Sequence, residues 1–258
     1  MDINHERLIT LLTRLKLTTV RDRLDSLLDE AARKEMNLRE ALTFFCQQEA
    51  ESKDHKRIRM GIIMSKFPFN RTLDQFDFSA QPSIDAGRIR ELSTCRWVAN
   101  GDSLLLQGPP GVGKTHLAVA FGREAIVRGY SALFISAAAL LTQSTKAHQE
   151  GKLDEKITQL SKAKLLIVDE LGYLPFDPKA AHLFFQLASK RYEKGSILVT
   201  SNRSIGEWGE VFGDSVVATA ILDRLLHHSH VVTIRGESYR LKEKRQSGLI
   251  KTSQERAQ

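Results

Sequence analysis

The segment Ser103-Leu-Leu-Leu-Gln-Gly-Pro-Pro-Gly-Val-Gly-Lys-Thr115 joins a short apolar run to a glycine-rich loop that ends in Lys-Thr. Its second part fits the pattern GxxxxGK[ST], which predicts a phosphate-binding loop between a strand and a helix. Glycines let backbone N–H groups turn inward around a phosphate, and the helix N-terminus adds partial positive charge. The residues expected to bind ATP are Gly108, Pro109, Pro110, Gly111, Val112, Gly113, Lys114 and Thr115. In this arrangement Lys114 reaches the β- and γ-phosphates, and the Thr115 hydroxyl ligates Mg²⁺.

Short apolar runs alternate with helical segments throughout this part of the chain. The runs that predict strands are 103–107, 131–136, 165–169, 196–201 and 231–234. The segments that predict helices are 114–128, 137–150, 152–163, 178–193 and 215–228. Five short strands separated by helices indicate an α/β fold with a parallel five-stranded sheet and helices on both faces.

The third predicted strand ends in two carboxylates, in the run Leu-Leu-Ile-Val-Asp169-Glu170. Asp169 suits the metal shell around the phosphates, whereas Glu170 suits polarising an attacking water. Phosphate transfer to a substrate hydroxyl needs no such water-activating glutamate, so the pair favours ATP hydrolysis. The alternative is an aspartate that only caps the loop after its strand.

Two further polar residues are candidates for the site, each with a structural alternative. Asn202 ends the fourth predicted strand, where ligands of parallel sheets bind, and could hold the attacking water. An ordinary asparagine at a strand end is the other interpretation. Arg224 lies on a late helix, where it could form a local ion pair with Asp223 or act as an arginine finger. The pattern alone leaves both choices open.

Longer stretches of the chain resemble the AAA+ ATPases, specifically the initiator and helicase-loader clade, and most closely the IstB-like ATPases that assist insertion-sequence transposition. The stretches that carry the resemblance are GPPGVGKTHLA (108–118), LLIVDELGYLP (165–175), Arg191-Tyr192-Glu193, Thr200-Ser201-Asn202, Trp208, AILDRLLHH (220–228), GESYRLK (236–242), Phe67-Pro68 and the pair Phe76 and Phe78. They extend over nearly the whole chain.

The resemblance implies a role for each matching residue. Lys114 would hold phosphate and Thr115 would hold Mg²⁺. Asp169 would bind the metal and Glu170 would activate water. Asn202 would be the first sensor, and Arg224 would be the arginine finger offered to a neighbouring subunit. Arg240 would be a second sensor that contacts nucleotide. Only 24 residues follow Ile234, too few for the helical lid of many AAA+ proteins. We therefore expect a lidless ATPase whose nucleotide is enclosed by an adjacent subunit.

The first part of the chain predicts a separate helical domain. Leucines recur at helical spacing before residue 30, and a third helix is expected after Asn37. Pro68 breaks that helix. We expect an all-α domain over residues 1–68 that serves partner binding or self-association, followed by the ATPase domain over 69–258 with a basic C-terminal tail. The leucines could instead pack on the chain's own ATPase domain.

Basic residues flank the predicted ATPase. The net charge is +7 and the isoelectric point about 9.4, a balance that favours a polyanionic partner. Such runs can also be no more than solvated faces and tails. The candidates for contact with double-stranded DNA are Lys53, Lys56, Arg57, Arg59, Lys146 and Lys152.

Cysteines and hydropathy bear on the compartment. Cys46 and Cys95 lie 49 positions apart, without the spacing of a disulfide framework or zinc site. The N-terminus lacks a signal pattern, and no apolar run reaches the ~18 residues of a membrane span. We expect a cytoplasmic protein with no membrane partner.

Together with the resemblance, these features predict a DNA-dependent ATPase. It would oligomerise on double-stranded DNA with ATP, as a ring or an open helical assembly, and assist a transposase in insertion-sequence transposition. One alternative is a DnaC- or DnaI-like loader of a replicative helicase. Another is a nucleotide-dependent interaction switch with negligible turnover.

Overall fold

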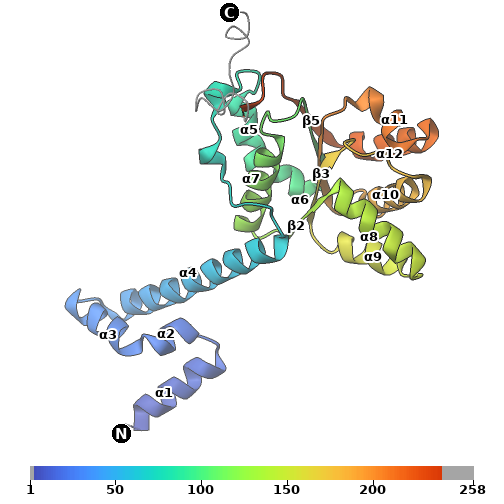
Figure 1. Ribbon diagram of the computed structural model, residues 1–258. Helices are drawn as coiled ribbons and strands as arrows, with labels where there is room; N and C mark the ends of the chain where they lie inside the picture. Colours follow the sequence, from blue (N-terminus) through green and yellow to red (C-terminus); the bar gives the residue numbers. More distant parts are fainter. Residues whose placement is uncertain (1–2, 240–258) are drawn as a thin grey trace, which may run out of the picture. The chain divides into compact units, whose positions relative to one another are not determined.

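The computed structural model describes residues 3–239 (Figure 1). Contacts between residues divide the chain into two compact units, Met1–Met60 and Gly61–Gln258. The division lies within the long helix α4 (Leu38–Ser65), earlier than the boundary expected after residue 68. The last residues of α4 belong to the second unit, where a Cβ on Gly61 would lie 2.6 Å from Ile126 Cγ2.

The N-terminal unit consists of helices. They are α1 (Ile3–Arg14), α2 (Thr18–Asp22), α3 (Leu24–Arg33) and the first part of α4. Its small core contains Leu12, Val20, Leu24 and Leu27. The buried Glu49 carboxylate on α4 accepts hydrogen bonds from the backbone N–H groups of Thr19 (2.7 Å) and Val20 (3.0 Å). This carboxylate therefore caps the otherwise unsatisfied N-terminus of α2.

The second unit is built on a five-stranded sheet in the order β2-β3-β4-β1-β5, and every neighbouring pair is parallel. The strands are β1 (Ser103–Gln107), β2 (Ala132–Ser136), β3 (Leu165–Leu171), β4 (Ser196–Ser201) and β5 (Ser229–Thr233). Strand β5 begins two residues earlier than expected because Ser229 pairs with Ser103 at the start of β1. The predicted parallel α/β sheet is thus confirmed.

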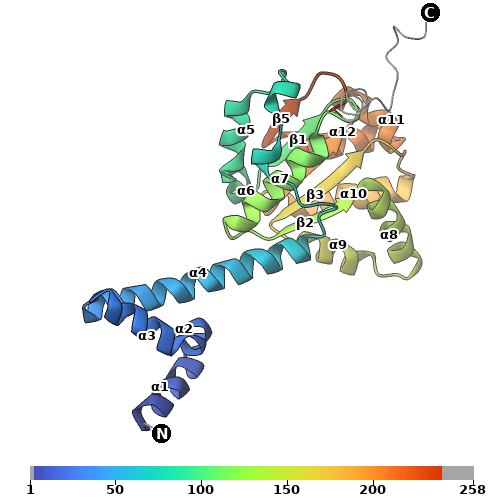
Figure 2. The same ribbon diagram turned by 60° about the vertical axis from the view of Figure 1, so that its left-hand side comes forward.

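Helices cover both faces of this sheet (Figures 1 and 2). One face carries α5 (Ala86–Ser93), α6 (Arg96–Asn100) and α7 (Lys114–Val127). The other carries α8 (Ala137–Gln149), α9 (Leu153–Ser161), α10 (Pro178–Arg191), α11 (Trp208–Phe212) and α12 (Ser215–Leu226). Short 3₁₀ turns occupy Leu73–Gln75, Phe78–Ala80 and Ile205–Glu207.

Local sequence explains where several of these helices begin. The side chains of Ser136, Asp177 and Asp214 accept hydrogen bonds from backbone N–H groups in the first turns of α8, α10 and α12. Pro178 occupies the first turn of α10, where its missing N–H has no cost. Within residues 3–239, no helix is long and apolar enough to cross a bilayer.

Candidate nucleotide site

The glycine-rich loop lies between the end of β1 and the start of α7. Gly111 and Gly113 have φ of +82° and +96°, a backbone region that side chains disfavour. A Cβ on Gly113 would lie 2.6 Å from Phe76 Cε2, so this position requires glycine on two counts. Val112 is fully buried and anchors the loop. The backbone is therefore held in the tight turn that a phosphate cradle needs.

Lys114 is the first residue of α7, and its side chain folds back over the loop. Its Nζ donates hydrogen bonds to the carbonyl oxygens of Gly108 (2.6 Å) and Pro109 (2.8 Å). The ammonium group thus lies at the mouth of the cradle, where phosphate oxygens of a bound nucleotide can replace the carbonyls as acceptors.

Thr115 and Asp169 come together across the first helix turn and the third strand. The Thr115 hydroxyl is 3.0 and 3.1 Å from the two carboxylate oxygens of Asp169. Burial raises the pKa of Asp169, although hydrogen bonds from Thr200 and Thr115 oppose the shift. A hydroxyl beside a buried carboxylate is an all-oxygen donor set of the kind that Mg²⁺ prefers. These two residues therefore fit the predicted metal site.

Thr200 on β4 links both acidic residues, and the sequence analysis assigned it no role. Its Oγ1 donates to Asp169 (2.6 Å) and accepts from the backbone N–H of Glu170 (2.9 Å). The signal in the sequence was a threonine next to an apolar strand run. In the structure this residue is fully buried. The contact depends on the register between β3 and β4, which one strand's sequence does not reveal.

Glu170 points away from the core into solvent. Its φ of +61° lies in the left-handed region, and the pairing of β3 with β4 shifts between Val168 and Leu171. This irregularity turns the side chain outward beside the buried Asp169. Strained backbone of this kind clusters at functional sites, and the position leaves the carboxylate accessible to water.

Asn202 follows the last residue of β4, at the same carboxyl edge of the sheet. The side-chain oxygen Oδ1 is buried and has no hydrogen-bond partner among the described residues. Neighbouring Ser201 accepts a bond from the N–H of Gly108 through its carbonyl (3.1 Å). The asparagine is thus beside the phosphate loop, with an acceptor that a water could satisfy.

Arg224 lies near the end of α12, at the opposite edge of the sheet. Just after that helix, the carbonyl of His228 accepts a hydrogen bond from the N–H of Ser103, the first residue of β1 (2.8 Å). The phosphate loop follows the last residue of β1, at the opposite end of the strand. The five residues of β1 span about 16 Å. Arg224 is therefore not brought together with the other predicted site residues of its own chain.

A buried arginine, Arg191, lies near Arg224. Its guanidinium donates to the carbonyls of Leu160, Lys164 and Ser196 at 2.8–3.2 Å, and burial lowers its pKa to about 10. Tyr192 follows it and contacts His227 Nδ1 through its hydroxyl (2.7 Å).

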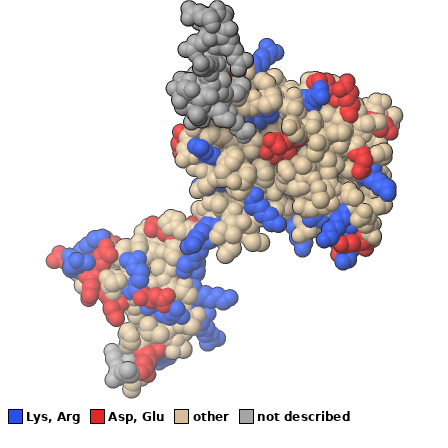
Figure 3. All heavy atoms as spheres, in the orientation of Figure 1, with Lys and Arg blue, Asp and Glu red and all other residues tan. Residues whose placement is uncertain are grey.

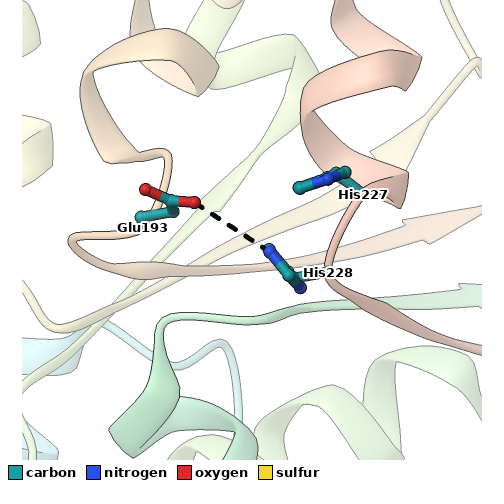
Figure 4. Close-up of side chains that lie close together, drawn as sticks. All are labelled: Glu193, His227 and His228. Atoms are coloured by element: carbon teal, nitrogen blue, oxygen red, sulfur yellow. Dashed lines mark ion pairs between the residues drawn. The ribbon is translucent and has the colours of Figure 1, made fainter.

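A histidine cluster lies beside this edge (Figure 4). Glu193, His227 and His228 offer ligand atoms within 4.8 Å of one another, and the Glu193 carboxylate faces His228 Nε2 at 3.9 Å. All three are exposed. Their donor set could hold a transition-metal ion, but it lies apart from the phosphate loop and does not belong to the predicted Mg²⁺ site.

The candidate DNA contacts belong to helix α4 and to the segment of α8 and α9. Arg240 is outside the described residues. The candidate DNA contacts are all exposed, and Lys53 and Arg57 pair with acidic residues of α4 at 3.4 and 3.3 Å. Figure 3 shows clusters of Lys and Arg on the N-terminal unit, interspersed with Asp and Glu. Lys146 and Lys152 both lie near Glu150, at 3.9 and 3.8 Å.

Comparison with known proteins gives one consistent family. The family model for IstB-like ATP binding proteins matches residues 10–247. A protein of insertion sequence IS21 from Pseudomonas aeruginosa is 48% identical over 246 residues, covering 95% of this chain and 92% of its own. A protein of insertion sequence IS5376 from Geobacillus stearothermophilus is 47% identical over 240 residues, covering 93% and 96%.

Solved structures match in fold. DnaI superimposes with a TM-score of 0.54 at 23% identity, over 68% of this chain and 93% of DnaI. AMPPCP-bound DnaA from Aquifex aeolicus gives 0.53 at 24% identity, over 74% of this chain and 59% of DnaA. At this level of identity the likeness shows a shared fold only.

Proposed function

The chain belongs to the family of IstB-like ATP-binding proteins, and from this we propose that it is a DNA-dependent AAA+ ATPase that assists a transposase. It assembles on double-stranded DNA when ATP is bound, and it prepares or selects target DNA for insertion-sequence transposition. The observation that carries the proposal is that the predicted site residues lie at opposite ends of the strands. The phosphate loop, Asp169, Glu170 and Asn202 lie at the carboxyl ends, and Arg224 lies near the amino ends.

At the carboxyl edge, each residue has a task in hydrolysis. Lys114 and the loop N–H groups bind the phosphates, and Thr115 and Asp169 are placed to hold Mg²⁺, which neutralises phosphate charge when bound. Glu170 accepts the proton of the attacking water, and Asn202 orients that water through its unpaired oxygen. Among the described residues, the predicted finger does not lie at this edge, because Arg224 is near the opposite end of β1, about one strand length along the sheet.

A second copy can supply the missing arginine. If the edge that carries Arg224 docks on the phosphate loop of the next copy, the contact is heterologous. Such contacts close into rings or continue as open helices. Either assembly repeats basic surface along a duplex without requiring sequence-specific contacts. Arg240 remains a candidate second sensor for the nucleotide.

Assembly on DNA predicts a steep response to salt. For six phosphate contacts, affinity should fall about a thousandfold between roughly 50 and 200 mM salt. Fluorescence anisotropy on a labelled duplex, with ATP and without any helicase, measures this. Lys56→Gln combined with Arg59→Gln should flatten the slope, because neither residue has an acidic partner within 4.0 Å among the described residues. Lys34→Gln is the control, since Lys34 already pairs with Glu30.

The same experiment separates the alternatives. A helicase loader would bind the duplex weakly until a hexameric helicase is added. A flat dependence of affinity on salt would contradict the proposed electrostatic contact with DNA. An interaction switch would bind DNA with ATP but release almost no phosphate, which a phosphate-release assay on the same mixture detects. Phosphate release stimulated by duplex DNA supports the ATPase.

We also assign the N-terminal unit a role in contacts with a transposase or other copies. Helix α1 and the turn that follows it expose Leu8, Leu11 and Leu15 by 40%, 46% and 64%, at the spacing of one helix face. Replacing all three by Ser should lower transposase stimulation or assembly about tenfold or more, with ATP affinity unchanged.

The control for this triple variant is Leu12→Ser, because Leu12 is only 8% exposed and its loss should unfold the unit. Strand-transfer assays and sedimentation on DNA provide the measurements. Full stimulation and assembly by the triple variant would show that this face has no partner.

A further inference from the structure

The surroundings of Arg224 are unusual for a half-buried arginine. No carboxylate lies within 4.0 Å of its guanidinium among residues 3–239, so the ion pair with Asp223 is not formed. One nitrogen, Nη1, donates to the carbonyl of Ala220 one turn earlier on the same helix (2.9 Å). The central carbon Cζ lies 4.5 Å from the centre of the Phe185 ring. Arg224 is thus held without being neutralised.

Phe185 is itself held in place by the protein core. It lies on α10, which packs against α12, and its side chain is half-buried against the main hydrophobic cluster. His182, one turn earlier, places its ring 6.4 Å away. A ring fixed in this way presents one face to the guanidinium, as cation–π contacts require.

We propose that Phe185 positions Arg224 for the nucleotide of the neighbouring copy. The inference rests on the proposed function, because it assumes that Arg224 acts as the finger. An arginine has five N–H donors. Of its two contacts described above, only the hydrogen bond to Ala220 uses a donor, whereas the contact with the Phe185 ring uses none. The ring therefore restricts the side chain while leaving charge and donors available to phosphate oxygens. A carboxylate in the same place would neutralise the charge and would have to be displaced first.

The test compares Phe185→Leu with Phe185→Tyr in the full chain. Leucine keeps apolar volume but removes the aromatic face, so kcat for DNA-stimulated ATP hydrolysis should fall about fivefold. Tyrosine keeps the face and should stay within about twofold of the unchanged chain. ATP affinity should not change in either variant, because Phe185 lies away from the phosphate loop. If Phe185→Leu folds poorly, as judged by thermal unfolding, Phe185→Met gives the same comparison.

A double-mutant cycle distinguishes positioning from a merely structural role. In the background of Arg224→Ala, Phe185→Leu should cause no further loss of kcat. An equal loss in both backgrounds, or an unchanged kcat for well-folded Phe185→Leu, overturns the proposal. If Arg224→Ala itself retains full activity, the finger assignment fails instead, and the two failures are therefore distinguishable.

Discussion

Replacing Glu170 by Gln should stop ATP hydrolysis while ATP binding and assembly on DNA persist. The amide cannot accept the proton of the attacking water, and loss of a general base typically lowers the rate by about 10² to 10⁴-fold. The phosphate loop and the Thr115–Asp169 pair make no hydrogen bond to the Glu170 side chain among the described residues; Glu170 joins this network through its backbone N–H, which donates to Thr200 Oγ1. The variant should therefore hold ATP and remain on the duplex.

The comparison with Lys114→Ala gives this prediction its control. Removing the ammonium group takes a positive charge from the cradle, so ATP affinity and ATP-driven assembly should both fall. Equilibrium binding of a fluorescent ATP analogue, together with phosphate release, separates the two variants. If Glu170→Gln lost ATP binding as severely as Lys114→Ala, Glu170 would have a structural role.

Replacing Arg224 by Ala should have the larger effect on turnover at saturating ATP. Removal of an arginine finger typically lowers the rate by about 10³ to 10⁵-fold, because the charge that develops on the phosphate oxygens is no longer balanced. ATP binding by the isolated chain should be unaffected, since Arg224 lies at the far edge of its own sheet. The fold should also survive, because the side chain forms no ion pair with a described carboxylate and makes one bond, within its own helix.

Much of this architecture could be predicted because its signals are local. The phosphate loop is one contiguous motif, and five apolar runs separated by helices leave few options beyond a parallel sheet. Asp169 and Glu170 were identified as a pair for the same reason, since both end one apolar strand. Their different surroundings were not predictable, because burial of Asp169 and the outward turn of Glu170 depend on the irregular pairing of β3 with β4.

Contacts between distant segments account for what the sequence did not reveal. Thr200 joins Asp169 only through strand register, and Phe185 meets Arg224 only because α10 packs on α12. Sequence spacing left Arg224 with two interpretations, and the structure removes the ion pair with Asp223. The cap that Glu49 provides for α2 bridges 30 positions of the chain, beyond any capping pattern readable along one helix.

In the proposed assembly, each nucleotide site is completed by Arg224 of another copy. The most direct measurement is phosphate release, on duplex DNA, by a mixture of Arg224→Ala and Glu170→Gln chains. Each variant alone should be nearly inactive, but in the mixture an Arg224→Ala copy keeps its Glu170 and receives the finger of a Glu170→Gln neighbour. Part of the activity should therefore return. A control mixture of Arg224→Ala chains with the double variant Glu170→Gln/Arg224→Ala should stay inactive, because neither chain carries the finger. No recovery, although sedimentation shows that both variants occupy the same assemblies on DNA, would contradict completion of the site by a neighbouring copy.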